Sequence, residues 1–167
     1  MKIVLLERNS AGTDVPVDCF QELGEVISYP NTVTAQEVAE RVSDADVIVC
    51  NKAPMREESL KNCPNVKLIC ELATGYDNCD LAYCKSRGIK VANVVDYSTA
   101  MVAQHTFTLA LALSQKLPYY DEYVKSGAYS AQDRFSNFDR PFYELEGKTW
   151  GIVGMGNIRS DRNGFRL

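Results

Sequence analysis

The stretch GKTWGIVGMGNI, residues 147–158, decides how the fold is interpreted. Its apolar run at 150–153 is typical of a short buried parallel strand, and glycines at 154 and 156 follow that run directly. A strand that leads into such a turn and then a helix opens a dinucleotide-binding unit. The first glycine permits the tight turn, and the second lets backbone N–H groups approach a pyrophosphate. We therefore expect the residues before this turn to be the front part of a larger α/β protein.

The residues after the turn do not complete this pattern. Arg159 stands where a third glycine would allow a helix to pack closely on the strand, and residues 160–167 show no apolar helical face. Residues 159–167 hold three arginines and one aspartate, so they contribute +2 to the net charge of −4 and residues 1–158 contribute −6. We expect 159–167 to be an aberrant tail that arises from an altered reading frame or an early stop. Sequencing the gene would test this hypothesis.

Composition indicates a soluble globular protein, with 46% apolar and 24% charged residues. The net charge of −4, without a basic stripe, argues against nucleic acid or an anionic membrane as a partner. The longest apolar stretch, around 107–113, is too short to span a bilayer, and no signal peptide is expected. Six cysteines without a C-x-x-C pair, and one histidine, predict free thiols in the cytoplasm and no metal site.

Strand-like and helix-like patterns alternate through residues 1–95. Strands are expected at 2–6, 25–28, 46–50, 66–71 and 90–94, and helices at 18–23, from 34 onward, at 55–62 and at 77–87. Thr34 and Glu37 have the spacing of a capping box, and Gly24 is expected to end the first helix in a left-handed conformation. This alternation predicts a parallel sheet with helices on both faces, which binds ligands at the carboxyl ends of its strands.

Residues 100–115 form the most apolar helical pattern of the chain. The pattern is apolar on most sides, so the helix is expected to be buried between domains or subunits, and Pro118 is expected to end it. A second helix to Lys125 and then a long exposed arm to residue 143 should follow.

Two loops at the predicted carboxyl edge of the sheet are candidate carboxylate sites. Thr74 and Gly75 lie between a strand and a helix N-terminus, where free N–H groups favour an anion. The alternative is that Gly75 serves only a tight turn and Asp77 only caps a helix. Asn51 and Lys52 end the third strand at the same edge, and Lys52 either adds positive charge to the pocket or is a solvated loop residue.

Three further residues have chemically active side chains without a clear site. His105 lies within the apolar helix, which favours a packed core histidine over a catalytic one. Cys79 and Cys84 are expected on one helix, where inert packing is favoured over redox chemistry.

Three segments together resemble the D-isomer-specific 2-hydroxyacid dehydrogenases, particularly their glycerate dehydrogenase (hydroxypyruvate reductase) branch. They are ATGYDNCD at 73–80, VAQHT at 102–106 and the stretch at 147–158, in matching order and spacing. The resemblance implies a flavodoxin-like substrate domain at 1–98 and, at 99–158, the start of an incomplete Rossmann NAD-binding domain. It also implies a homodimer built by residues 99–145.

The resemblance assigns roles to single residues of this chain. Thr74 and Gly75 would hold the carboxylate of a small 2-oxo or 2-hydroxy acid through backbone N–H groups, and Asn51 and Lys52 would line the same pocket. Val102 would lie near the nicotinamide of NAD. The residues that would cradle the cofactor phosphates are Gly154, Met155, Gly156, Asn157 and Ile158.

The resemblance also implies what this chain lacks. The family's catalytic Arg, Glu and acid/base His lie far downstream of the glycine turn, so no catalytic residue is predicted here, and His105 is not their replacement. Complete relatives reduce a 2-oxo acid such as hydroxypyruvate with NADH. We expect this chain to be inactive by itself, with NAD binding in doubt. The alternatives are a small-carboxylate binding module and a dimerising fragment, both without chemistry.

Overall fold

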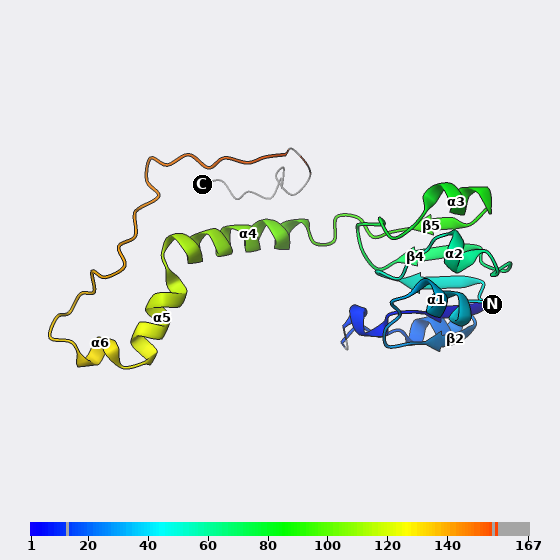
Figure 1. The fold of residues 1–167 in the computed structure, drawn as a ribbon, viewed down its shortest axis with the longest axis horizontal. Coiled ribbons are helices and arrows are strands. Elements are labelled where there is room, and N and C mark those ends of the chain that lie inside the picture. The colour runs from blue at the N-terminus through cyan, green and yellow to red at the C-terminus, as the bar shows by residue number, and fades with distance from the viewer. Residues whose placement is uncertain (13, 155, 157–167) are drawn as a thin grey trace. The chain divides into compact units, whose positions relative to one another are not determined.

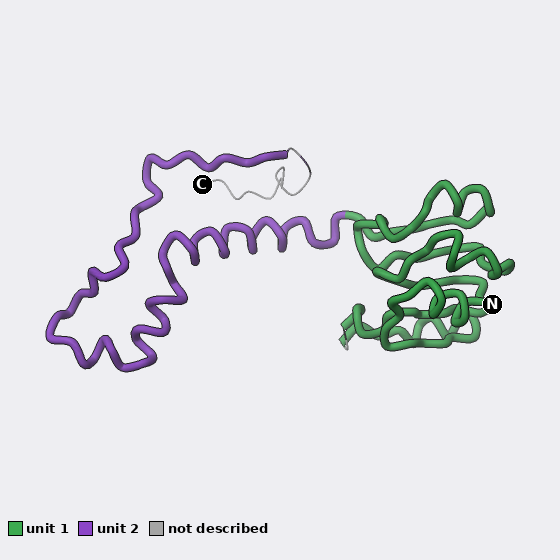
Figure 2. The backbone as a smooth tube through the Cα atoms, viewed as in Figure 1, with its two compact units in different colours: residues 1–95 green, residues 96–167 purple. Residues whose placement is uncertain are grey.

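The computed structural model describes residues 1–12, 14–154 and 156. Contacts divide the chain into two compact units, Met1–Val95 and Asp96–Leu167 (Figure 2). The boundary expected after residue 98 lies three residues beyond this division and stays a prediction.

The first unit is built on five parallel strands (Figure 1). They are β1 (Lys2–Leu5), β2 (Glu25–Ser28), β3 (Val47–Cys50), β4 (Leu68–Glu71) and β5 (Lys90–Ala92). The sheet order is β2-β1-β3-β4-β5, the order of flavodoxin-like doubly wound proteins. Residues Ile3, Val47 and Leu68 stand in register across the three central strands. The predicted fold class of this unit is confirmed.

Three short α-helices connect the strands: α1 (Ala35–Arg41), α2 (Glu57–Leu60) and α3 (Leu81–Ser86). The capping box predicted at the start of α1 is confirmed, because Thr34 Oγ1 accepts from the Glu37 N–H at 3.2 Å and Glu37 Oε2 accepts from the Thr34 N–H at 2.9 Å. Asp80, rather than Asp77, caps α3 by accepting from the Tyr83 N–H at 2.9 Å.

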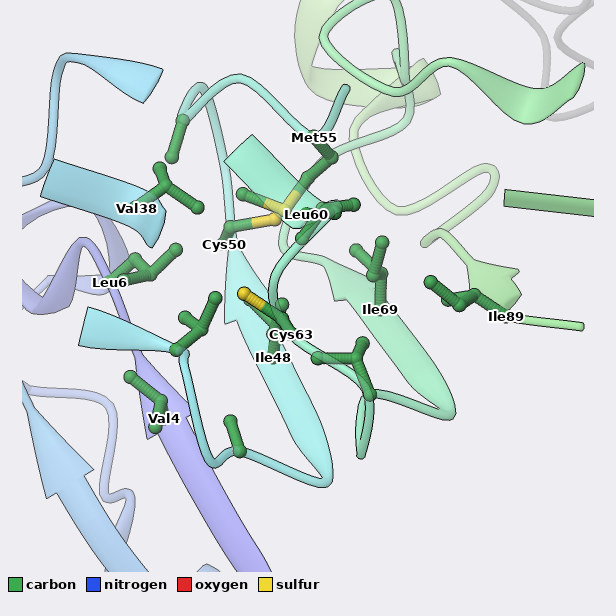
Figure 3. Close-up of a cluster of buried hydrophobic side chains, with 14 of the residues drawn as sticks. Val4, Leu6, Val38, Ile48, Cys50, Met55, Leu60, Cys63, Ile69 and Ile89 are labelled. Carbon is green, nitrogen blue, oxygen red and sulfur yellow. The ribbon is translucent and has the colours of Figure 1, made fainter. Parts of the chain in front are cut away.

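The α-helices α1, α2 and α3 cover only one face of the sheet. Their apolar side chains and the inner residues of β1, β3 and β4 form the main core (Figure 3). A smaller cluster of Ile3, Leu5 and Val49 lies on the opposite face, against Val17 and Phe20. The expectation of helices on both faces is therefore only partly met. Right-handed crossovers explain the asymmetry, because only the β1–β2 connection runs in the opposite direction along the sheet.

That single opposite connection contains two 3-10 helices, η1 (Arg8–Ala11) and η2 (Asp18–Glu22), in place of the α-helix expected at 18–23. Gly24 is not a left-handed helix cap. A Cβ at this position would lie 2.0 Å from the Met1 carbonyl oxygen, so the close approach of the two strands requires glycine.

The second unit contains α4 (Thr99–Ser114), α5 (Leu117–Lys125) and α6 (Ala128–Ala131). Pro118 does not end α4 as expected. It lies in the first turn of α5, where its missing N–H has no helical partner to lose, and Lys116 makes the break with a φ of 53°. No helix of the described residues is both long and apolar enough to cross a membrane. Most apolar side chains of α4 are exposed, and Ala103 is its one buried residue.

The run at 150–153 does not form the expected strand, and Val153 is fully exposed. A strand needs a neighbouring strand for its N–H and C=O groups, and none is present among the described residues of this unit. Trp150 instead packs its ring against Phe107 of α4, with a centroid distance of 4.8 Å.

Candidate functional site

The candidate site lies at the carboxyl edge of the sheet, where loops follow β1, β3, β4 and β5. The loop after β4 is tied to the end of β5 by three hydrogen bonds. Thr74 Oγ1 donates to Val94 O at 2.8 Å, Asn93 Nδ2 donates to Thr74 O at 2.7 Å, and the Val94 N–H donates to Ala73 O at 3.0 Å. Thr74 is therefore held by both its side chain and its carbonyl group.

Gly75 is exposed and is not required by the local backbone. A Cβ at this position would meet only Asp77 Oδ2, at the ordinary contact distance of 3.8 Å, and its φ lies outside the left-handed range. No hydrogen bond within the described part of the chain uses the N–H groups of residues 74–76. The tight-turn alternative therefore has no support in the geometry, whereas close approach of a ligand to bare backbone would favour glycine here. The carboxylate-binding role of Thr74 and Gly75 stays a prediction.

The N–H groups of the loop after β3 are already occupied. Those of Asn51, Lys52 and Ala53 donate to the same oxygen, Glu7 Oε2, at 2.7, 2.8 and 3.0 Å. Glu7 follows β1 and is only 9% exposed, whereas the Lys52 side chain is exposed. No sequence motif predicts this role of Glu7. The signal that could have identified it is an acidic residue placed directly after the first buried strand.

Glu71, at the end of β4, forms a second buried polar cluster that no sequence motif predicts. Its Oε1 accepts from Asn78 Nδ2 at 2.7 Å and from the thiols of Cys50 and Cys79 at 3.1 Å each. Its buried Oε2 has no hydrogen-bond partner among the described residues. Asn78 Nδ2 also donates to Ala53 O at 3.0 Å, so it joins the loops after β3 and β4.

The surroundings of the buried cysteines favour the thiol over the nucleophilic thiolate. Burial, and then the nearby Glu71 carboxylate, raise the pKa of the Cys50 and Cys79 thiols. Burial also raises the pKa of Cys84 on α3. Inert packing is therefore the better interpretation of Cys79 and Cys84, although Cys79 lies before the helix rather than on it. The described residues contain no group of three or more His, Cys, Asp or Glu that could hold a metal ion.

His105 and Val102 lie on α4 in the second unit, and both are exposed. The expectation of a packed core histidine is wrong for this chain, since α4 buries only Ala103. The placement of Val102 beside a nicotinamide stays a prediction.

The described residues of the glycine stretch do not form a dinucleotide pocket. Gly154 has a φ of 107°, which suits a glycine turn, but the run before it is exposed and unpaired. A Cβ at Gly151 or Gly156 would meet no atom within 4 Å, so no surrounding structure requires glycine at these two positions. Met155, Asn157, Ile158 and the tail at 159–167 lie outside the described residues. The described residues of this stretch therefore do not fit a bound NAD.

Comparisons with known proteins identify relatives for most of the chain. The family model described as D-isomer specific 2-hydroxyacid dehydrogenase, catalytic domain, matches residues 4–150. The chain is 36% identical over 161 residues to the hydroxypyruvate reductase of Blautia hydrogenotrophica, covering 95% of this chain and 50% of that protein. It is 37% identical over 157 residues to the glycerate dehydrogenase of Methylorubrum extorquens, covering 94% and 49%.

Solved structures give the same result. The D-lactate dehydrogenase from Aquifex aeolicus, complexed with NAD and lactic acid, matches with a TM-score of 0.71 and 28% identity over 96% of this chain and 46% of that chain. A putative D-isomer specific 2-hydroxyacid dehydrogenase from a Polaromonas species matches with a TM-score of 0.79 and 25% identity, covering 94% and 49%. The chain thus spans about half the length of the relatives it matches. It belongs to the D-isomer specific 2-hydroxyacid dehydrogenase family.

Proposed function

We propose that this chain is the acid-recognising part of an NAD-dependent D-2-hydroxyacid dehydrogenase of the glycerate dehydrogenase (hydroxypyruvate reductase) kind. Its first unit would hold the carboxylate of a small 2-oxo or 2-hydroxy acid at the loop 74–76. The identity to relatives named hydroxypyruvate reductase and glycerate dehydrogenase supports this substrate class.

The single observation that carries the proposal is Gly75. The chain's own packing leaves room for a Cβ at this position, yet glycine stands there beside N–H groups that no described residue uses. A carboxylate that approaches the backbone closely would explain both features. Thr74, fixed by Val94 O and Asn93 Nδ2, would keep the loop in place while the acid binds.

In the complete enzyme the nicotinamide would supply the hydride. The residues of this chain would have a different task, which is to hold the carboxylate and so orient the 2-oxo carbon beside it. We propose that the 167-residue polypeptide alone does not oxidise NADH in the presence of hydroxypyruvate. A rate above that of the uncatalysed mixture, measured by NADH absorbance with purified chain, would overturn this proposal.

Calorimetric titration with D-glycerate and with glyoxylate tests the binding site. The wild-type chain should bind with a measurable heat, and Gly75→Ala should weaken binding about tenfold or more, because one charge-assisted hydrogen bond is blocked. Gly151→Ala is the matched control, since its Cβ also meets no obstacle. Equal affinity of Gly75→Ala and the wild type, or the absence of binding by the wild type, would reject the site.

A second candidate function is self-association through residues 99–145, as a dimerising fragment. The exposed apolar side chains of this region favour it: they include Leu113 at 76%, Phe135 at 88% and Phe138 at 73%. Light scattering should then give twice the monomer mass, and a monomer at all concentrations would count against it.

We also propose a cytoplasmic location, which is compatible with cysteines that are all free. Recovery of the tagged chain in a secreted fraction would contradict this.

A further inference from the structure

Three successive backbone N–H groups converge on one carboxylate oxygen in the first unit. The N–H groups of Asn51, Lys52 and Ala53 lie 2.7, 2.8 and 3.0 Å from Glu7 Oε2. Successive N–H groups in a loop of this kind form an anion-binding nest, and hydrogen bonds to a charged acceptor are stronger than neutral ones. We call residues 51–53 the β3 nest. Its occupant is a side chain of the same protein.

The β3 nest lies where a ligand would be expected in such a sheet. β1 and β3 are neighbours, but the connection from β1 leads to β2 on one side and the connection from β3 leads to β4 on the other. This is the topological switch point, and doubly wound sheets bind ligands in the crevice outside the strand ends there. In this chain, Glu7 is the second residue after β1, and its carboxylate accepts the hydrogen bonds of the β3 nest.

We infer that Glu7 is a built-in ligand of the β3 nest, so that the nest is a small-carboxylate site which the protein itself keeps filled. This inference rests on the proposed function for one consequence: the acid substrate is left with the N–H groups of the loop 74–76. The backbone at 51–53 then contributes no contact to the substrate carboxylate. Only the side chains of Asn51 and Lys52 remain available to line the pocket.

Glu7 also acts as a positioning residue for the loop after β3. It holds the Ala53 N–H, while Asn78 Nδ2 holds the Ala53 carbonyl at 3.0 Å from the other side. The same Asn78 accepts at its backbone carbonyl from the Met55 N–H at 2.9 Å. The loops after β1, β3 and β4 are thus connected through Ala53, with Glu7 supplying the only charge among these contacts.

Chemical rescue by formate tests the inference on the full chain. Glu7→Ala empties the nest, and the melting temperature should fall by an amount on the order of 10 °C because charge-assisted hydrogen bonds are lost. Added sodium formate should then raise the melting temperature of Glu7→Ala saturably, because it binds the folded state at the emptied nest. The exposed-site control Glu22→Ala and the wild type should respond to formate clearly less than Glu7→Ala does, because their β3 nest is already filled and only the loop 74–76 is open to the anion; chloride at equal ionic strength corrects for salt.

The inference is overturned if folded Glu7→Ala responds to formate no more than Glu22→Ala does. Amide hydrogen exchange in the wild-type chain provides a measurement that does not depend on the variant folding. The amides of residues 51–53 should exchange about tenfold or more slowly than those of residues 74–76, since only the former are hydrogen-bonded. Equal exchange rates in the two loops would also reject it.

The two proposals fail separately. Formate rescue without any glycerate binding by the wild type would reject the proposed function but support the inference on the β3 nest. Glycerate binding that depends on Gly75, without formate rescue of Glu7→Ala, would support the proposed function and reject the nest.

Discussion

Helices α2 and α4 both contain leucines, but the leucine of α2 is buried and those of α4 are exposed. Leu60 of α2 is fully buried in the main core, whereas Leu109, Leu111 and Leu113 of α4 are 52%, 47% and 76% exposed. α2 lies against a sheet and a neighbouring helix, and no surface of the described second unit covers α4 in the same way. Apolar periodicity therefore predicts which face of a helix needs burial but does not identify the partner that buries it.

Removal of one leucine side chain from each unit gives the largest expected difference. Leu60→Ala should lower the free energy of unfolding by about 2–5 kcal/mol, because it leaves a cavity in a packed core. Leu113→Ala should change it by less than about 0.5 kcal/mol, since that side chain is already in water. Urea unfolding followed by circular dichroism measures both. If Leu113→Ala lowered the free energy of unfolding as much as Leu60→Ala does, α4 would be buried in solution. The stated difference in burial between the two helices would then be wrong.

Glycine substitutions should have the next largest effect on stability, and they test the backbone packing of the two units. Gly24→Ala places a Cβ 2.0 Å from the Met1 carbonyl oxygen and should cost about 1–3 kcal/mol, because β1 and β2 must move apart. Gly151→Ala meets no atom within 4 Å and should leave the free energy of unfolding unchanged. The same urea experiment separates them. Equal stability of the two variants would contradict the close approach of Gly24 to the Met1 carbonyl oxygen.

The N-terminal caps of α1 and α4 also differ between the two units, with a smaller expected effect on stability. Thr34→Ala removes the side-chain oxygen that caps α1 and should cost about 1 kcal/mol. Ser98 precedes α4 without making a side-chain cap hydrogen bond, so Ser98→Ala should have little effect on thermal unfolding. A loss at Ser98 equal to that at Thr34 would show that α4 is capped in solution.

The smallest expected effect is a pH dependence that belongs to the first unit. The Lys2 backbone N–H, and then the Lys67 side chain, hold the pKa of the Asp46 carboxyl below its ordinary value of 3.8. A depressed folded-state pKa stabilises the fold above the ordinary value, and this contribution is lost as the pH falls through the folded-state pKa. Wild type should therefore melt above Asp46→Asn at about pH 6, and the gap should close towards about pH 3. A difference in melting temperature that stays constant between about pH 6 and about pH 3 would contradict the depressed pKa of Asp46.

The sequence predicts the elements of the first unit well because their signals are local. The Thr34 capping box, the five strand positions and the sheet class depend on residues near one another in the chain. Glu7 and Glu71 escaped prediction because their roles depend on distant partners. The hydrogen-bond partners of Glu7 are residues 51–53, which lie 44 to 46 positions further along the chain. The local sequence does not show whether an acidic side chain at a strand end points to water or to such a nest.

In the second unit, local sequence signals predict the structure less well. The helical patterns at α4 and α5 were sufficient to predict helices, but burial of His105 and the strand at 150–153 both required partners that the described residues do not provide. The apolar run and the glycine turn indicate ancestry. Hydrogen bonds to a neighbouring strand, which a local pattern cannot supply, decide whether a strand forms.

We propose that the first unit recognises a small carboxylate at the loop 74–76. The most direct test is a titration of the ¹⁵N-labelled 167-residue chain with D-glycerate, followed by amide chemical shifts. We expect saturable shifts centred on the amides of Thr74, Gly75 and Tyr76, with smaller changes at Asn51 and Lys52. Shifts confined to residues 96–154, or no saturable shift at all, would contradict it.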